Sequence, residues 1–265
     1  MSAIGALART QLRRTSRSRL FVVGVLVALV LVAGVVESVI GIRTWTSQAV
    51  SAAIAWDVIS FYAIVGFVLA ALLGAWTIQS ERRDKTWQVM LCKPVMPWQI
   101  VVGKFLGVMS VLGTLTLVLW AILHVLLAIT LRTYFPRVDV ALALQLISFS
   151  IPAALSLCLT LRFHPILAVA ITLLLRYEFL DALFASLTSS QYPAAVLFVP
   201  AGLVAMVRMI APSYEAFDLT VSLRTMASLL WTRQAWVVAY AVSIDSLLLW
   251  IATAVLRARE LAKTL

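Results

Sequence analysis

Charged residues are scarce in this chain: only 12% of its 265 residues are Asp, Glu, Lys or Arg, whereas 63% are hydrophobic. A soluble domain of this size typically has about a quarter charged residues and about half apolar ones. The scarcity of charge argues against a water-soluble fold. It predicts a chain whose apolar surface is covered by lipid.

Residues that commonly carry chemistry are also few. The chain has two cysteines, Cys92 and Cys158, and two histidines, His124 and His164, well separated along the sequence. Their spacing argues against a disulfide and excludes a spaced metal-ligand set. The motifs G-x-x-x-x-G-K-[ST], H-E-x-x-H and G-x-S-x-G are absent, so we predict no catalytic residue, metal or cofactor on this chain.

Long apolar runs make up most of the sequence. A helix that crosses a bilayer needs about 20 mostly apolar residues, and six segments qualify: 20–41, 58–79, 105–130, 140–161, 165–186 and 235–256. We therefore predict an all-α membrane protein with six transmembrane helices, forming a single transmembrane domain over residues 1–265. The first run exceeds the apolar region of a signal peptide and has no cleavage site, so we expect it to be retained.

The N-terminal 19 residues hold five arginines and no acidic residue. Apolar residues recur there at near-helical spacing with arginines on the opposite face, which predicts an amphipathic helix at the membrane interface. A disordered basic tail is the alternative.

The distribution of lysine and arginine predicts the orientation of the chain in the membrane. With the N-terminus inside, 14 basic residues fall in inner segments and 7 in outer segments or outer span ends. The positive-inside rule therefore places both termini in the cytoplasm. The membrane is expected to be a bacterial inner membrane. The same rule explains the net charge of +10 without a nucleic-acid partner.

Residues 187–234 contain both an apolar run and residues that disfavour a membrane span. Residues 193–211 are apolar enough to span but contain Pro200 and Arg208, and a full crossing would give seven spans and an external C-terminus. We predict an extracytoplasmic segment that re-enters the outer leaflet or packs on the outer ends of the spans.

The most polar long interval is residues 77–104, between the second and third runs. Trp87, Met90 and Leu91 share one face at helical spacing, and nearby basic residues could pair with acids on a partner. Pro94 and Pro97 are expected to end this short helix. The pattern alone is equally compatible with an ordinary positive-inside loop.

Several residues of this interval resemble the permease subunits of ABC-2 type exporters. The family pattern is close to E-x-x-x-G-T-x-x-x-L-L-x-x-P-x-[ST]-R followed by G-K; the matching residues here are Glu81, Thr86, Met90, Leu91, Pro94, Gly103 and Lys104. Lys85 replaces the usual Gly, Met90 the first Leu, and Met96-Pro97 a small polar residue and Arg. Residues 211–219 also resemble the family's P-x-x-x-x-F-[DN] segment before the last span.

The resemblance implies a cytoplasmic coupling helix between spans 2 and 3. Its expected partners are two ABC ATPase subunits, which would bind ATP and Mg, and a second permease copy or a related permease, all in membrane lipid. The implied ATPase-coupling residues are Glu81, Arg82, Arg83, Lys85, Thr86, Trp87, Met90, Leu91 and Pro94. Glu81 could instead form a local ion pair with Lys85.

Three ionisable residues in the spans are candidates for the translocation pathway: Asp245, His124 and Arg176. Intramembrane ionisable groups are costly and face protein or water. The alternative for Asp245 is a packing role with Ser243 or Ser246 as hydrogen-bond partner, and for His124 a satisfied packing residue. Arg176 is expected near the outer end of the fifth span.

Other functions are a membrane-embedded structural subunit or secondary carrier without an ATPase, and a lipid-modifying membrane enzyme. The ionisable residues are too scattered for the enzyme. A carrier tends to show inverted repeats, and no internal repeat is visible.

Overall fold

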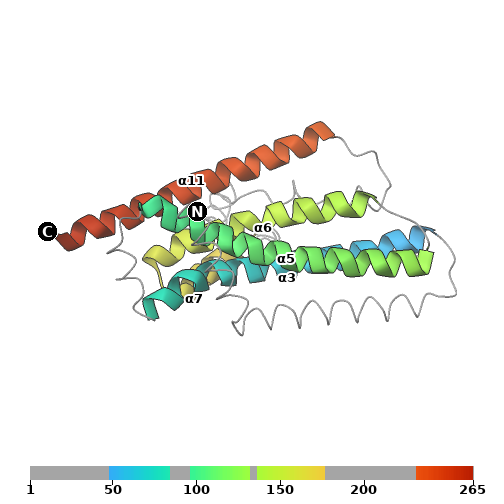
Figure 1. Cartoon of the computed structure of the whole chain (residues 1–265), viewed down its shortest axis with the longest axis horizontal. Coiled ribbons are helices and arrows are strands. Elements are labelled where there is room, and N and C mark those ends of the chain that lie inside the picture. Colours follow the sequence, from blue (N-terminus) through green and yellow to red (C-terminus); the bar gives the residue numbers. More distant parts are fainter. Residues whose placement is uncertain (1–47, 84–95, 132–135, 177–230, 265) are drawn as a thin grey trace, which may run out of the picture.

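The computed structural model describes residues 48–83, 96–131, 136–176 and 231–264. Within these ranges the regular structure is entirely helical, which confirms the all-α class for the described part (Figure 1). The helices are α3 (Gln48–Arg83), α5 (Pro97–Leu131), α6 (Pro136–Arg162), α7 (Pro165–Leu174) and α11 (Trp231–Thr264).

Four of these helices contain stretches long and apolar enough to cross a membrane: Val58–Gln79, Pro97–Val125, Val138–Arg162 and Gln234–Ala258. They fall on the predicted spans 58–79, 105–130, 140–161 and 235–256. The predicted span 20–41, the N-terminal amphipathic helix and most of 187–234 lie outside the described residues. Of the predicted span 165–186, the structure describes a helix only over Pro165–Leu174, so the count of six spans stays a prediction.

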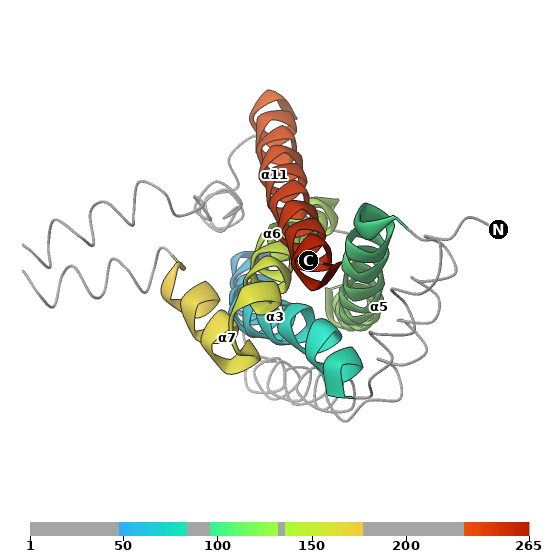
Figure 2. The same cartoon turned by 90° about the vertical axis from the view of Figure 1, so that its left-hand side faces the viewer.

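The helix α6 is central to the described bundle. It packs against α3, α5, α7 and α11, while α7 also packs against α3 and α11 also packs against α5 (Figure 2). Each of the other helices therefore shares an interface with α6.

The two ends of the bundle are distinct. Helices α3, α6 and α11 run in one direction and α5 runs in the other (Figure 1). The loop end, as we call it, holds Arg83, Pro97, the junction of α6 with α7, and Thr264. The distal end holds Gln48, Leu131, Pro136 and Trp231.

Small residues let α3 approach α6 closely. Gly66, Ala70 and Gly74 follow one another at four-residue intervals along α3, and Ala70 is fully buried. A Cβ on Gly66 would overlap the Phe149 ring, and one on Gly74 would lie 2.6 Å from the backbone oxygen of Ala153. Glycines that permit close backbone approach are typical of helix pairs in membranes, so this interface depends on them.

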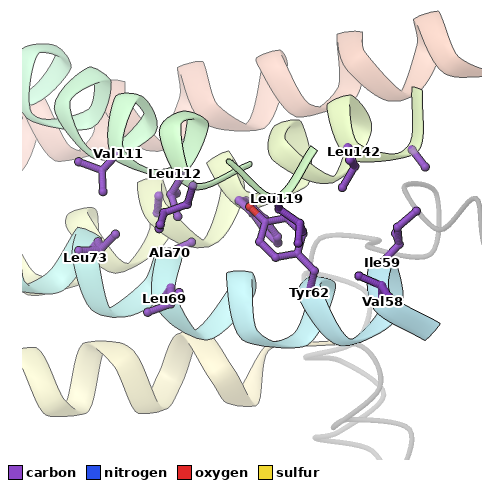
Figure 3. Packing of buried hydrophobic residues seen from close by; sticks show 14 of the residues in the cluster. Val58, Ile59, Tyr62, Leu69, Ala70, Leu73, Val111, Leu112, Leu119 and Leu142 are labelled. Atoms are coloured by element: carbon purple, nitrogen blue, oxygen red, sulfur yellow. The ribbon is translucent and has the colours of Figure 1, made fainter. Parts of the chain in front are cut away.

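The largest buried cluster fills the space between α3, α5 and α6 (Figure 3). Tyr62 reaches into it from α3; its hydroxyl lies 2.7 Å from Thr116 Oγ1, and its ring meets Phe149 edge-on at 5.3 Å between centroids. A buried phenol needs such a hydrogen-bond partner. The cluster therefore joins three helices through both apolar packing and one polar contact.

The start of α5 differs from the sequence expectation. Pro97, which is expected to help end the coupling helix, is the first residue of α5, where its missing N–H leaves no helical bond unmade. The Met96 N–H donates to Gln99 Oε1 at 3.2 Å, as the third residue of a capping box does. Residues 97–104, predicted as loop, are therefore helical.

Candidate functional site

The predicted coupling residues fall partly within the described chain. Glu81, Arg82 and Arg83 form the last turn of α3 at the loop end. The other predicted contacts lie outside the described residues: Lys85, Thr86, Trp87, Met90, Leu91 and Pro94. The coupling face itself stays a prediction, and the structure describes the helices on either side of residues 84–95, α3 and α5.

A second buried cluster lies at the loop end, next to the points where α3 ends and α5 begins. Ile78 of α3 and Val101 of α5 belong to it, and its other members come from α6 and α11: Leu157, Leu161, Ala252 and Leu256. Four helices thus meet close to the 84–95 connection. Ile78 and Val101 thus share one apolar cluster with side chains of α6 and α11.

Lys104 is a buried basic residue in this half of α5. Its exposed fraction is 3%, whereas the sequence predicts a polar loop at this position. Buried residues three before and four after it, Val101 and Val108, share its side of the helix. That spacing was the available sequence signal that Lys104 continues a buried helical face.

The loop end is the more basic end of the described helices. Its helix ends hold six Lys or Arg residues and those of the distal end hold two; the six are Arg82, Arg83, Arg162, Arg257, Arg259 and Lys263, and the two are Arg137 and Arg233. The asymmetry predicted from the sequence is thus present between the two ends of the bundle.

His124 belongs to a polar group at the distal end. The Trp120 indole N–H donates to Asp139 Oδ1 at 2.6 Å, and His124 Nδ1 lies 3.0 Å from the Trp120 carbonyl oxygen. His124 Nε2 lies 3.0 Å from the same Asp139 oxygen, without the alignment of a hydrogen bond. The group joins the end of α5 to the start of α6, which fits the packing alternative for His124.

Arg176 lies deeper along the apolar stretches of the bundle than the sequence predicts. Its guanidinium carbon is 5.2 Å from the centroid of the Phe67 ring, and Phe67 is near the middle of the apolar stretch Val58–Gln79. The sequence predicts a position near the outer end of a span, whereas Arg176 follows the end of α7 at Leu174 and lies against the middle of the α3 stretch. A cation over an aromatic face is favourable and holds this residue against α3.

Asp245 lies near the middle of the stretch Gln234–Ala258 of α11 and is half-buried. Its carboxyl group interacts with the Ser150 hydroxyl of α6. Ser243 and Ser246, the partners considered from the sequence, donate to the carbonyls of Ala239 and Val242 in their own helix, each at 2.7 Å. Sequence spacing could not identify Ser150, because it belongs to a different helix.

The three candidate pathway residues do not gather in one place. His124 is at the distal end, Arg176 contacts α3, and Asp245 contacts α6 from α11. Within the described residues no group of three His, Cys, Asp or Glu side chains could hold a metal ion. The described residues thus form a packed helical bundle with separate polar contacts.

The chain matches the model of a known protein family. A family model described as ABC-2 family transporter protein matches residues 9–189, which is more than half of the chain. The chain belongs to the ABC-2 transporter family. The match includes α3, α5, α6, α7 and the connection between α3 and α5.

This ABC-2 permease is an integral membrane protein, as its family and its long apolar helices show. A search of curated proteins found no match. The family assignment confirms the resemblance drawn from residues 77–104. The helix α11 and the second resembling segment, residues 211–219, lie beyond the matched range.

Proposed function

We propose that the chain is the permease subunit of an ATP-driven ABC-2 type exporter. Two copies, or this chain and a related one, form the translocation pathway, and two separate ATPase subunits bind the 77–104 segment. ATP and Mg are bound and ATP is hydrolysed on those partners. The observation that carries the proposal is that α3, which ends within this segment, and α5, which begins within it, share a buried cluster with α6 and α11.

The proposed coupling works by contact between rigid helices. A partner that binds the 84–95 connection pulls or pushes the last turn of α3 and the first turn of α5. Ile78 and Val101 pass that displacement to the α6 and α11 members of the same cluster. Packed interfaces respond to such a load by shifting between discrete arrangements rather than by bending continuously, which is the change that alternating access needs.

The basic loop end supports a cytoplasmic position for the coupling segment. Lys and Arg are retained on the cytoplasmic side of membrane proteins, and six basic residues lie in helix ends there against two at the distal end. An ATPase that consumes cytoplasmic ATP would meet the permease at this end. Both chain termini are proposed to lie on the same side, in a bacterial inner membrane.

The test is co-purification with a candidate ABC ATPase in detergent. We expect Trp87→Ala, Leu91→Ala and Glu81→Gln each to reduce association and coupled ATP hydrolysis at least tenfold. Trp236→Ala is the matched control, because Trp236 is a tryptophan 77% exposed on α11 and far along the chain from the segment.

If the permease is stable but binds no ATPase, and the three substitutions change nothing, the proposal fails. That result would favour a structural subunit or a carrier without an ATPase.

A further inference from the structure

The helix α7 ends about halfway across the apolar part of the bundle. It begins at Pro165 at the loop end and ends at Leu174. Its 10 residues cover about 15 Å, half of a hydrocarbon core of about 30 Å. The ring contact gives the same depth, because Arg176 lies against Phe67, near the middle of the stretch Val58–Gln79. Helix length and side-chain contact thus agree on mid-depth.

The backbone leaves the α-helical path at this depth. The Leu175 N–H donates to the Ile171 carbonyl at 3.0 Å, and the Arg176 N–H donates to the Leu173 carbonyl at 3.2 Å. Other carbonyls of a last helical turn have no donor within their own helix. Inside a membrane, such a helix end is tolerated where protein covers it or water reaches it. Leu174 is exposed and Arg176 is half-buried, so the end of α7 is not enclosed by protein.

Arg176 brings a permanent positive charge to the same depth. A charged group at the centre of a bilayer is costly unless it faces the bundle interior or water. The contact with the Phe67 ring and the negative end of α7 offset part of that cost. The guanidinium also carries five N–H donors in a planar fork that matches a carboxylate or a phosphate. An anionic group is therefore the ligand best suited to this position.

The side of α3 that contacts Arg176 continues toward the distal end, beyond the reach of α7. Ser60 precedes Phe67 by seven residues, which is about two helical turns or roughly 10 Å, so the two residues lie on one side of α3. The Ser60 hydroxyl is buried and has no hydrogen-bond partner among the described residues, which is typical of a site that water or a ligand reaches. Between them Ile64 is 48% exposed.

We propose that these residues form a binding position for the anionic group of an amphipathic cargo, in the distal half of the translocation pathway. We call it the α3–α7 junction; its residues are Ser60, Ile64, Phe67, Leu174 and Arg176. Arg176 receives a carboxylate or phosphate group, and the apolar part of the cargo lies on the exposed Ile64 and Leu174 side chains. The role in transport rests on the proposed function, whereas binding and water access need no ATPase.

Thiol labelling in lipid nanodiscs tests whether water reaches the α3–α7 junction. The native cysteines are replaced by Cys92→Ser and Cys158→Ser, and Ile64→Cys is added to that background. Leu117→Cys is the matched control, because Leu117 is 63% exposed on α5 and also lies in the distal half of its apolar stretch, Pro97–Val125. Each variant is treated with an anionic sulfonatoethyl and a cationic trimethylammonium-ethyl methanethiosulfonate.

We expect both reagents to label Ile64→Cys much faster than Leu117→Cys, because charged reagents do not reach a thiol that faces lipid. At Ile64→Cys the anionic reagent should gain about tenfold over the cationic one, since a positive charge in a low-dielectric site concentrates anions. Arg176→Gln should abolish this preference for the anionic reagent. Arg176→Lys, which keeps the charge, should retain it, and a purely structural role of Arg176 would not produce this pattern.

A protection experiment tests the chemical class of the cargo. Dodecyl phosphate, an amphiphile with one phosphate group, should abolish labelling of Ile64→Cys as it saturates the site. Inorganic phosphate lacks the apolar part and dodecyltrimethylammonium has the opposite charge, so neither should protect at the same concentration. Arg176→Gln should remove the protection by dodecyl phosphate.

Three results would overturn the proposal: labelling of Ile64→Cys no faster than that of Leu117→Cys, an anion preference unchanged by Arg176→Gln, or equal protection by inorganic phosphate. If Arg176→Gln does not fold, salt decides, because an anion preference due to Arg176 should weaken at high ionic strength and one that does not weaken contradicts the proposal. These measurements use the permease alone, so their failure is distinct from a failure to bind an ATPase.

Discussion

The helices α6 and α11 have nearly the same mean hydropathy, yet they are buried to very different extents. Within the described bundle, 61% of the most apolar stretch of α6 is buried but only 17% of that of α11. Hydropathy measures the free energy of transfer from water into an apolar phase. Lipid provides such a phase as well as the protein interior does. The comparison shows that burial in this bundle is decided by helix packing.

The physical difference lies in the small and polar residues of α6. Ala153 and Ser156 lie against the α3 glycine Gly74, which brings the two backbones close. Ser156 and Thr160 are fully buried and donate to carbonyls of their own helix at 3.2 and 2.6 Å. Hydroxyls satisfied in this way can be buried without a further partner. On α11, large residues such as Trp236 and Trp250 are exposed at 77% and 69%.

The largest expected effect comes from breaking the α3–α6 contact. Gly74→Ala would place a methyl group 2.6 Å from the Ala153 carbonyl oxygen, and backbone cannot move aside cheaply. We expect a loss of about 3 kcal/mol or more, measured as a lower unfolding temperature and lower yield of monodisperse protein.

Gly113→Ala is the matched control for this prediction. A Cβ there meets only Leu146 Cδ2 at 3.9 Å, and alanine is the better helix former by up to about 1 kcal/mol. Equal damage from both substitutions would contradict the packing account of the α3–α6 interface.

The next prediction compares one leucine on each of the two helices. Leu157 on α6 is 1% exposed and Leu247 on α11 is 56% exposed. We expect Leu157→Ala to cost about 2–5 kcal/mol, because it leaves a cavity in a packed site, and Leu247→Ala to have little effect. Thermal unfolding of both variants in the same detergent measures the difference. A large loss from Leu247→Ala would mean that a protein surface covers this face of α11 in solution.

The smallest expected effect is at the distal end of α6. Asp139 accepts from Trp120 and lies beside His124, and it occupies the first turn of the helix, where negative charge is favourable. Asp139→Asn should destabilise by roughly 0.5–1 kcal/mol, since the group is partly exposed. Ser110→Ala, which removes only a hydroxyl bonded within α5, is the control. An equal loss of stability in Ser110→Ala would contradict a specific contribution from the Asp139 contacts.

Four apolar helices could be predicted from the sequence, three of them with accurate ends, and the positions of some polar residues could not. The ranges 58–79, 140–161 and 235–256 agree with the structural stretches within two residues at each end, because length and hydropathy define a span. The start of α5 was missed by eight residues, because Lys104 and Gln99 made a buried helical turn look like loop. The coupling residues from Lys85 to Pro94 remain predictions that the described residues do not test.

Arg176 and Asp245 show the other kind of miss. For Arg176 the sequence analysis favoured a position near the outer end of the fifth span, whereas the ring contact places Arg176 beside Phe67 at mid-depth. For Asp245 the sequence offered Ser243 and Ser246, and the partner is Ser150. Both errors arise because sequence distance predicts contacts within a helix and carries little information on contacts between helices.

The sequence by itself determined that this is a helical membrane protein, where four of its spans lie, and that it belongs with ABC-2 permeases. Those properties depend on composition, on the lengths of the apolar runs and on a local motif, and all three can be read from the sequence. Only the tertiary structure decided that α6 is central, that Gly66 and Gly74 bring α3 against it, that Lys104 is buried and that Asp245 meets Ser150. Lipid accepts any apolar helix face, so the choice of neighbours rests on shape and hydrogen bonding between helices.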